Sequence, residues 1–172
     1  MIQFLGILFI VGGILGLGNN YLEKEKQRIV RLETWEYITE LYISEIKYKK
    51  QPLFLASIEI GKKIEGDYGN ILKNIGEKMS AGKEDVFSQI WKKEWGCLIK
   101  KEPLKKEEKK MILDFPLFTG FENEELQRNM LKVQQDKWKK IREQAEEENR
   151  EKKKIVFLLS FSTGILIVLI LL

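Results

Sequence analysis

The stretch EIKYKKQPLFLASIEI, residues 45–60, decides how this chain folds, because it joins two helices of opposite character at one proline. Residues 45–49 are mostly charged and are typical of a helix near its end, whereas residues 53–60 are almost uncharged. Proline disfavours helical geometry in the residue before it and fits the first turn of a new helix. The sequence therefore predicts a break at Gln51-Pro52 and a second helix over about 52–64.

This second helix has one predicted core face, because Leu53, Ala56 and Ile60 recur at helical spacing. Three further apolar side chains lie off that face, which is more than a solvated helix needs: Phe54, Leu55 and Ile58. The helix is therefore either central and buried all round, or a core helix with one side that faces a partner.

Helical spacing of apolar residues continues through most of the chain, and no strand signal rises above background. The pattern predicts a first helix that continues from the N-terminal segment to Gln51-Pro52, and a last helix that runs from Asn123 to the end. Three shorter helices are expected over about 70–79, 84–99 and 104–118, although Pro116 is a candidate for ending the last of these early. The expected fold class is all-α: a small antiparallel bundle of about six helices.

The predicted core of this bundle contains the four tryptophans, Trp35, Trp91, Trp95 and Trp138. On the last helix, the apolar stripe expected to face inward comprises Leu126, Met130, Val133, Lys137 or Trp138, Ile141 and Ala145. The single cysteine, Cys97, lies among apolar residues and is interpreted as a buried structural thiol.

Both ends of the chain are apolar. Residues 1–22 and 155–172 contain no charged residue, although 33% of the whole chain is charged. At about 1.5 Å per residue, either end can cross a hydrocarbon core about 30 Å thick. Cleavage of the first as a signal peptide is the alternative, but a retained helix is favoured because no basic region precedes it.

Basic residues gather next to both apolar ends, after the first and before the second. The positive-inside rule therefore places the middle of the chain in the cytosol. The expected organisation is a transmembrane helix over 1–21, a cytosolic helical bundle over 22–145, a charged helical stalk over 146–154 and a transmembrane helix over 155–172. The stalk is too polar to pack on an apolar core. Small-residue pairs in the spans are compatible with packing of the spans or of neighbouring subunits, so a homo-oligomer is possible, although chance explains them as well.

The residues that carry most enzyme chemistry are absent or wrongly spaced. The chain has no histidine, one cysteine, and neither a phosphate-binding loop nor a dinucleotide motif. Its carboxylates alternate with lysines, as on a solvated helix face. An enzyme, a cofactor, a metal site and a small-molecule substrate are therefore not expected, and the balanced charge gives no sign of nucleic-acid binding.

The order of short motifs along the chain resembles the stage III sporulation protein AB family. The opening stretch matches E-I-x-Y-x-x-x-P-L-x-x-A, with Glu45, Tyr48, Pro52, Leu53 and Ala56 among its positions. Further matches follow at Gly120, Asn123 and Gln127, at Ala145 and Asn149, and at Leu159, Ser160 and Gly164. Three positions depart from the family pattern: Gln51 replaces a frequent Thr, Asn123 the usual Asp, and Ser160 a Gly.

The resemblance implies a non-enzymatic membrane protein of the engulfed forespore, similar to the F-type platform proteins of type II secretion. It implies a place in a channel complex between mother cell and forespore, in the mother-cell membrane, next to a secretion-type ATPase, stage III sporulation protein AA. The alternative is a membrane-tethered adaptor or regulator unrelated to secretion. The candidate contact regions are residues 52–60 and residues 120–127, although both are more readily explained as parts that shape the bundle.

Overall fold

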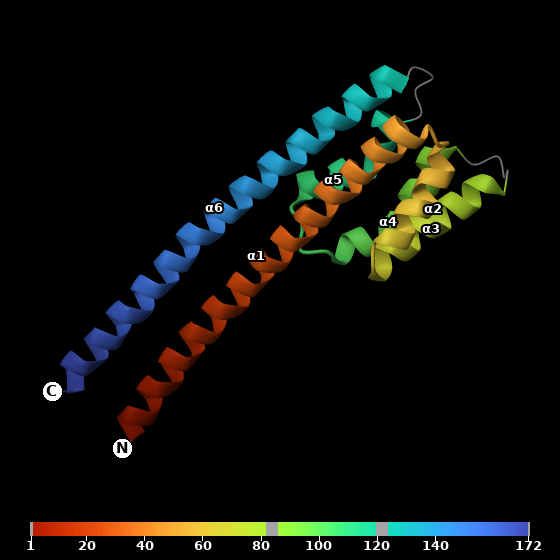
Figure 1. Ribbon diagram of the computed structural model, residues 1–172. Helices are drawn as coiled ribbons and strands as arrows, with labels where there is room; N and C mark the ends of the chain where they lie inside the picture. Colours follow the sequence, from red (N-terminus) through yellow and green to blue (C-terminus); the bar gives the residue numbers. More distant parts are fainter. Residues whose placement is uncertain (1, 82–85, 120–123, 172) are drawn as a thin grey trace. The chain divides into compact units, whose positions relative to one another are not determined.

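The computed structural model describes residues 2–81, 86–119 and 124–171 of the chain. Within these ranges the fold is all-helical and contains no strand, which confirms the predicted fold class (Figure 1). The elements are α1 (Ile2–Lys49), α2 (Leu53–Lys63), α3 (Gly66–Ser80), α4 (Phe87–Lys101), α5 (Lys106–Leu113), the 3₁₀ helix η1 (Phe115–Phe118) and α6 (Glu124–Leu171).

Contacts divide the chain into two compact units. One comprises Met1–Val30 and Ile141–Leu172, and the other comprises Arg31–Lys140. The second unit, here called the helical domain, therefore holds the C-terminal part of α1, the short helices and the N-terminal part of α6. This division does not test the domain boundaries expected from the sequence, which stay predictions.

The break at Pro52 lies where the sequence predicts it. α1 ends at Lys49, and Lys50 takes a left-handed backbone conformation with φ of 50°. α2 then begins at Leu53, and the amide of Ala56 donates to the Pro52 carbonyl at 3.0 Å. A left-handed lysine is uncommon because its Cβ crowds the backbone, so this sharp reversal depends on the packing of the two helices that it connects.

The core of the helical domain is centred on Trp35 of α1, which is fully buried. Its ring centroid lies 4.7 Å from that of Trp95 and 6.1 Å from that of Trp138. Trp91 and Tyr68 also lie beside it, at 6.2 and 5.8 Å. Large aromatic side chains supply much buried area and prefer such tilted or offset contacts. The predicted burial of all four tryptophans is confirmed.

Three glycines let α2 and α3 pack with their backbones almost in contact, as an antiparallel hairpin (Figure 1). A Cβ placed on Gly69 would lie 1.8 Å from the Ile64 carbonyl oxygen, and one on Gly76 would lie 2.5 Å from the Phe54 carbonyl oxygen. A Cβ on Gly61 would lie 2.7 Å from the Gly69 oxygen. α3 begins at Gly66, four residues before the expected start. Gly69, which belongs to a stretch that resembles a turn in the sequence, lies inside α3 and serves close packing instead.

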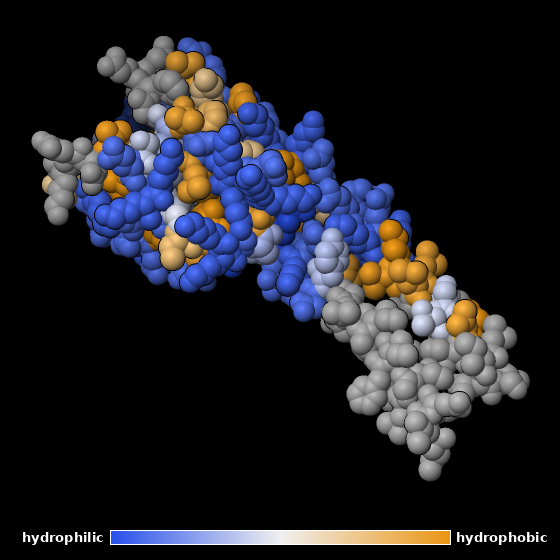
Figure 2. Space-filling model, turned by 180° about the vertical axis from the view of Figure 1, so that it is seen from behind, coloured by the Kyte–Doolittle hydropathy of each residue, from blue (hydrophilic) through white to orange (hydrophobic). Residues whose placement is uncertain are grey.

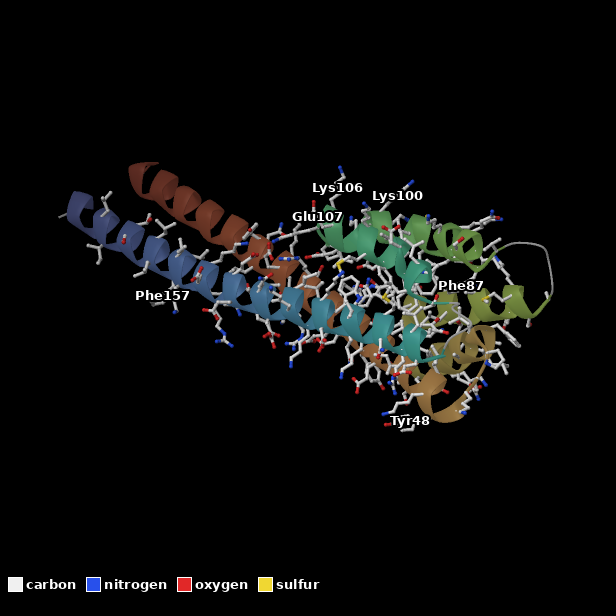
Figure 3. The ribbon with its side chains drawn as sticks, turned by 90° about the horizontal axis from the view of Figure 1, so that it is seen from above. Tyr48, Phe87, Lys100, Lys106, Glu107 and Phe157 are labelled. Atoms are coloured by element: carbon white, nitrogen blue, oxygen red, sulfur yellow. The ribbon has the colours of Figure 1, made fainter. Side chains whose placement is uncertain are left out.

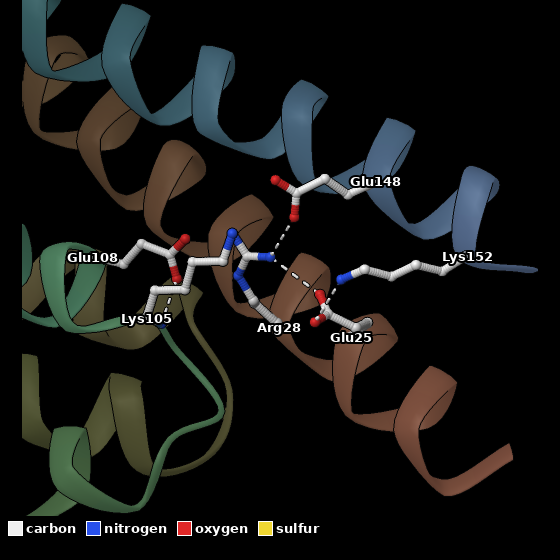
Figure 4. Close-up of polar contacts among 6 residues, drawn as sticks. All are labelled: Glu25, Arg28, Lys105, Glu108, Glu148 and Lys152. Carbon is white, nitrogen blue, oxygen red and sulfur yellow. Dashed lines mark hydrogen bonds and ion pairs between the residues drawn. The ribbon is translucent and has the colours of Figure 1, made fainter. Parts of the chain in front are cut away.

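The helix expected over about 104–118 is interrupted. α5 ends at Leu113, and η1 follows with Pro116 inside it. Proline cannot donate a backbone hydrogen bond and clashes with the preceding turn, so the α-helix stops before it. The sequence makes Pro116 a candidate for such an early end. At the start of α5, the amide of Lys105 donates to the Glu108 carboxylate at 2.7 Å, which caps the helix (Figure 4).

The inward face of α6 differs from the predicted stripe. Leu126 and Val133 are 45% and 48% exposed, whereas Gln127, Leu131 and Gln134 are buried. The predicted stripe was therefore wrong at these positions, because the buried face lies one residue further along the sequence. One residue corresponds to a rotation of about 100° around the helix axis. Cys97 was also misassigned, because it is exposed.

In the other unit, α1 and α6 are joined by charged side chains (Figure 4). Arg28 pairs with Glu25 on its own helix at 3.1 Å and with Glu148 of α6 at 3.5 Å. Lys152 of α6 pairs with Glu25 at 3.3 Å. We call these four residues the charge ladder. The predicted stalk is therefore too polar for an apolar core but pairs with α1 through ions.

Within the part of the chain that the structure describes, no helix is long and apolar enough to cross a membrane. The two terminal spans expected from the sequence stay predictions.

Candidate partner-contact site

The motif residue Glu45 is held inside the helical domain, with its side chain only 1% exposed. Lys63, the last residue of α2, donates to its carboxylate at 2.8 Å, and Lys49 donates at 3.0 Å. Burial alone would raise the pKa of Glu45, but the hydrogen bonds from these two lysines outweigh it and hold the pKa below its ordinary value. Glu45 therefore ties the end of α1 to the end of α2.

Tyr48 has the opposite environment, although it lies only three residues further on. It is 73% exposed and stands out from the surface of the helical domain (Figure 3). Lys47 donates to its hydroxyl at 3.0 Å and lies 4.6 Å from the ring centroid. This hydrogen bond lowers the pKa of the phenol. An exposed aromatic ring beside a cation is a frequent feature of binding surfaces. The side chain of Tyr48 is therefore accessible, and its role in partner contact stays a prediction.

The remaining motif residues at the break are divided between surface and core. Pro52 is exposed, Leu53 is half-buried and Ala56 is fully buried. The helix therefore has a buried face, as predicted, and only part of its outer side is open: Leu55 is 39% exposed. Of the two possibilities left open for α2, complete burial is wrong.

A hydroxyl pair that the sequence analysis missed fixes α2 against α1. The Ser57 hydroxyl donates to the Leu53 carbonyl at 2.9 Å, so the Tyr42 hydroxyl, 2.8 Å from Ser57 Oγ, is the donor in their contact. Burial raises the pKa of Tyr42, and the phenol stays protonated. The signal for this pair is weak, because serine and tyrosine at helical spacing are common on solvated faces.

Half of the second predicted contact region, residues 120–127, lies outside the described residues. Gly120 and Asn123 fall there, so their predicted roles stay predictions. Gln127 is 8% exposed and lies on the buried face of α6. Asn149, in the other unit, is 6% exposed, and among the described residues its Oδ1 has no hydrogen-bond partner. Neither side chain is open to a partner in this chain by itself.

A polar cleft of about 510 Å³ lies on the helical domain and was also missed. Its lining includes Arg31, Tyr37, Lys63, Asp67, Tyr68 and Glu102. Arg31 donates to the Glu102 carboxylate at 2.8 Å and lies 5.3 Å from the Tyr68 ring centroid. The charged residues come from α1, α2, α3 and the position directly after α4, so they are spread along the sequence and no short segment shows them together.

The buried carboxylates of the helical domain all have structural partners: Glu45 and Glu102 lie in ion pairs, and Glu108 caps α5. Over the described ranges no group of histidine, cysteine, aspartate or glutamate residues could hold a metal ion. On the face that Figure 2 shows, the surface of the helical domain is mostly hydrophilic. The exposed features that could take part in recognition are Tyr48, the neighbouring lysines and the surface recesses.

Comparisons with known proteins identify the family. The family model for stage III sporulation protein AB matches residues 3–172. A solved structure of stage III sporulation protein AB (SpoIIIAB) is similar in fold, with a TM-score of 0.63 and 18% sequence identity, over 72% of this chain and 97% of that chain. None of the curated proteins matches the chain. Because the family model spans nearly the whole sequence, the chain belongs to the stage III sporulation protein AB family.

Proposed function

We propose that this protein is a non-enzymatic membrane scaffold subunit of a secretion-like channel complex between mother cell and forespore, required for spore development. The match of the sporulation family model to residues 3–172 carries this proposal, because it gives the chain a sporulation-related role. The all-helical fold and the structural use of the buried carboxylates support a scaffold rather than a catalyst.

The proposed scaffold is anchored by two spans, residues 1–21 and 155–172, in the mother-cell membrane around the forespore. Its cytosolic bundle covers residues 22–145, and the charged segment 146–154 connects the bundle to the second span. The uncharged ends and the basic residues beside them support this topology.

The single cysteine offers a direct test of the topology. Cys97 is exposed on the helical domain, so it should react readily with a maleimide. In intact protoplasts a membrane-impermeant maleimide should leave Cys97 unlabelled, and permeabilisation should restore full labelling. A Cys97→Ser variant controls for background. Labelling in intact protoplasts would place the domain outside the cell and overturn the proposed topology.

The proposed partners are a secretion-type cytosolic ATPase, stage III sporulation protein AA, and other channel proteins of the same operon. Affinity purification of the tagged full chain from detergent-solubilised sporulating cells tests this. Recovery of the ATPase and channel components supports the scaffold. Recovery of a kinase or transcription regulator alone would support the alternative, a membrane-tethered adaptor unrelated to secretion.

A further inference from the structure

A recess of about 340 Å³ lies where the end of α1 meets the start of α6 in the helical domain. It is lined by Ile46 and Lys47 of α1 and by Glu125 and Arg128 of α6. Tyr48 and Lys50 lie one and three residues after Lys47, and both are exposed. We call this surface, formed by Ile46, Lys47, Tyr48, Lys50, Glu125 and Arg128, the α1-end recess.

Positive charge at the α1-end recess is only partly compensated. Among the described residues, Lys47 and Lys50 have no ion-pair partner, and Lys47 instead donates to the Tyr48 hydroxyl. Arg128 is 41% exposed, and its ion pair with Glu125 is long, at 3.9 Å. Among its described residues, the α1-end recess therefore presents three basic groups against one carboxylate, next to the Tyr48 ring.

The backbone at this surface is also unusual. Lys50 is the one non-glycine residue with positive φ in the described part of the chain. Strained backbone persists where surrounding structure holds it, and it is frequent at functional sites. Here the reversal at Lys50 follows Tyr48 by two residues, and the four residues 47–50 are all exposed.

We propose that the α1-end recess docks an acidic peptide segment of a partner protein. Carboxylates of the segment pair with Lys47, Lys50 and Arg128, and an apolar side chain of the segment packs on the Tyr48 ring and the Ile46 side of the recess. This inference rests on the proposed scaffold function only for the identity of the partner, because the recognition chemistry follows from the surface itself.

A protein segment fits this surface better than an anionic bilayer does. A flat layer of headgroups would contact the lysines but would not fill a recess of this volume, nor use an aromatic ring 73% exposed beside it. Pairing with a second copy of the same surface is unfavourable, because it would bring Lys47, Lys50 and Arg128 against the same three cations.

The test uses the full chain in nanodiscs of neutral lipid and a short fluorescein-labelled glutamate-rich peptide that contains one leucine. Fluorescence anisotropy measures the dissociation constant at low and moderate salt. The doubly substituted Lys47→Glu, Lys50→Glu variant should bind at least about tenfold more weakly. Glu125→Gln, which removes the only carboxylate among the described residues of the recess, should bind about two- to threefold more tightly.

A matched control carries the same change in charge elsewhere on the helical domain. Lys100 and Lys106 are exposed and lie on the opposite side of this domain from Tyr48 (Figure 3). The Lys100→Glu, Lys106→Glu variant should bind the peptide within about twofold of the parent chain. Equal weakening in both double variants would show that binding is unspecific attraction and would overturn the proposal.

Tyr48→Ala separates shape from charge, because it leaves the net charge unchanged. It should weaken binding about threefold or more; no effect would overturn the role of the ring. Vesicles of phosphatidylglycerol provide the lipid arm: if they displace the peptide at equal anion concentration, the surface prefers lipid and the proposal fails. These binding results stand whether or not sporulation depends on the protein, so the two proposals fail separately.

Discussion

Glu45 of α1 and Lys63 of α2 form an ion pair at 2.8 Å in which the glutamate side chain is almost completely buried and the lysine side chain is 42% exposed. The pair connects the ends of the two helices that meet at Pro52. It gives the glutamate of the family motif a structural role, next to a tyrosine of the same motif that points outward.

We expect Glu45→Gln to lower the free energy of unfolding by about 1–2 kcal/mol. The amide keeps the shape but leaves two lysines without their carboxylate, and the exposure of both lysines limits the loss. Urea unfolding followed by tryptophan fluorescence measures the change, because all four tryptophans are buried. The control is Glu59→Gln, which breaks the exposed pair with Lys62 and should leave the free energy of unfolding almost unchanged, because solvent screens this pair.

The contribution of Glu45 should also depend on pH. Because its folded pKa is lower than that of the unfolded chain, the carboxylate stabilises the fold above the unfolded pKa, and this contribution is lost as pH falls through the folded pKa. The stability difference between the parent chain and Glu45→Gln should therefore be constant near neutrality and shrink below about pH 4. A difference that grows on acidification would contradict the assignment.

Gly69→Ala should destabilise the helical domain by about 3 kcal/mol or more, because the added methyl would overlap the Ile64 carbonyl oxygen between α2 and α3 and lie 2.7 Å from the Gly61 oxygen of α2. Gly96 of α4 is the matched control, since no atom lies within 4 Å of the position its Cβ would take. Gly96→Ala should raise stability by about 0.5–1 kcal/mol through helix propensity. Thermal unfolding of both variants by circular dichroism compares them; equal behaviour would refute the close-packed hairpin.

The charge ladder predicts a rescue by charge exchange. Arg28→Glu should weaken the association of α1 with α6, because it places a glutamate among Glu25 and Glu148. Adding Glu148→Arg should restore part of the loss, since an opposite charge again faces position 28. Cysteine crosslinking between positions 24 and 151, in a Cys97→Ser background, reports the association. If the double variant crosslinks no better than the single one, the two side chains do not couple.

Several features could be predicted from sequence because they depend on local rules. Pro52 stops one helix and starts another whatever surrounds it. The helical spacing identifies an all-α chain, and the large apolar area of the tryptophans makes their burial favourable in any compact fold. The motif pattern also located Glu45 and Tyr48, although the sequence could not say that one is buried and the other exposed.

Only the tertiary structure decided which helix faces meet. On α6, Leu126 and Val133 resemble core residues, yet the position of Trp138 against Trp35 turns Gln127 and Gln134 inward instead. Gly69 belongs to a stretch that resembles a turn in the sequence, but in the structure it lies on the face of α3 that packs closely against α2. Both differences have the same physical reason. The residue type determines how much free energy a side chain gains from burial, but which face of a helix is buried depends on partner helices from distant parts of the chain.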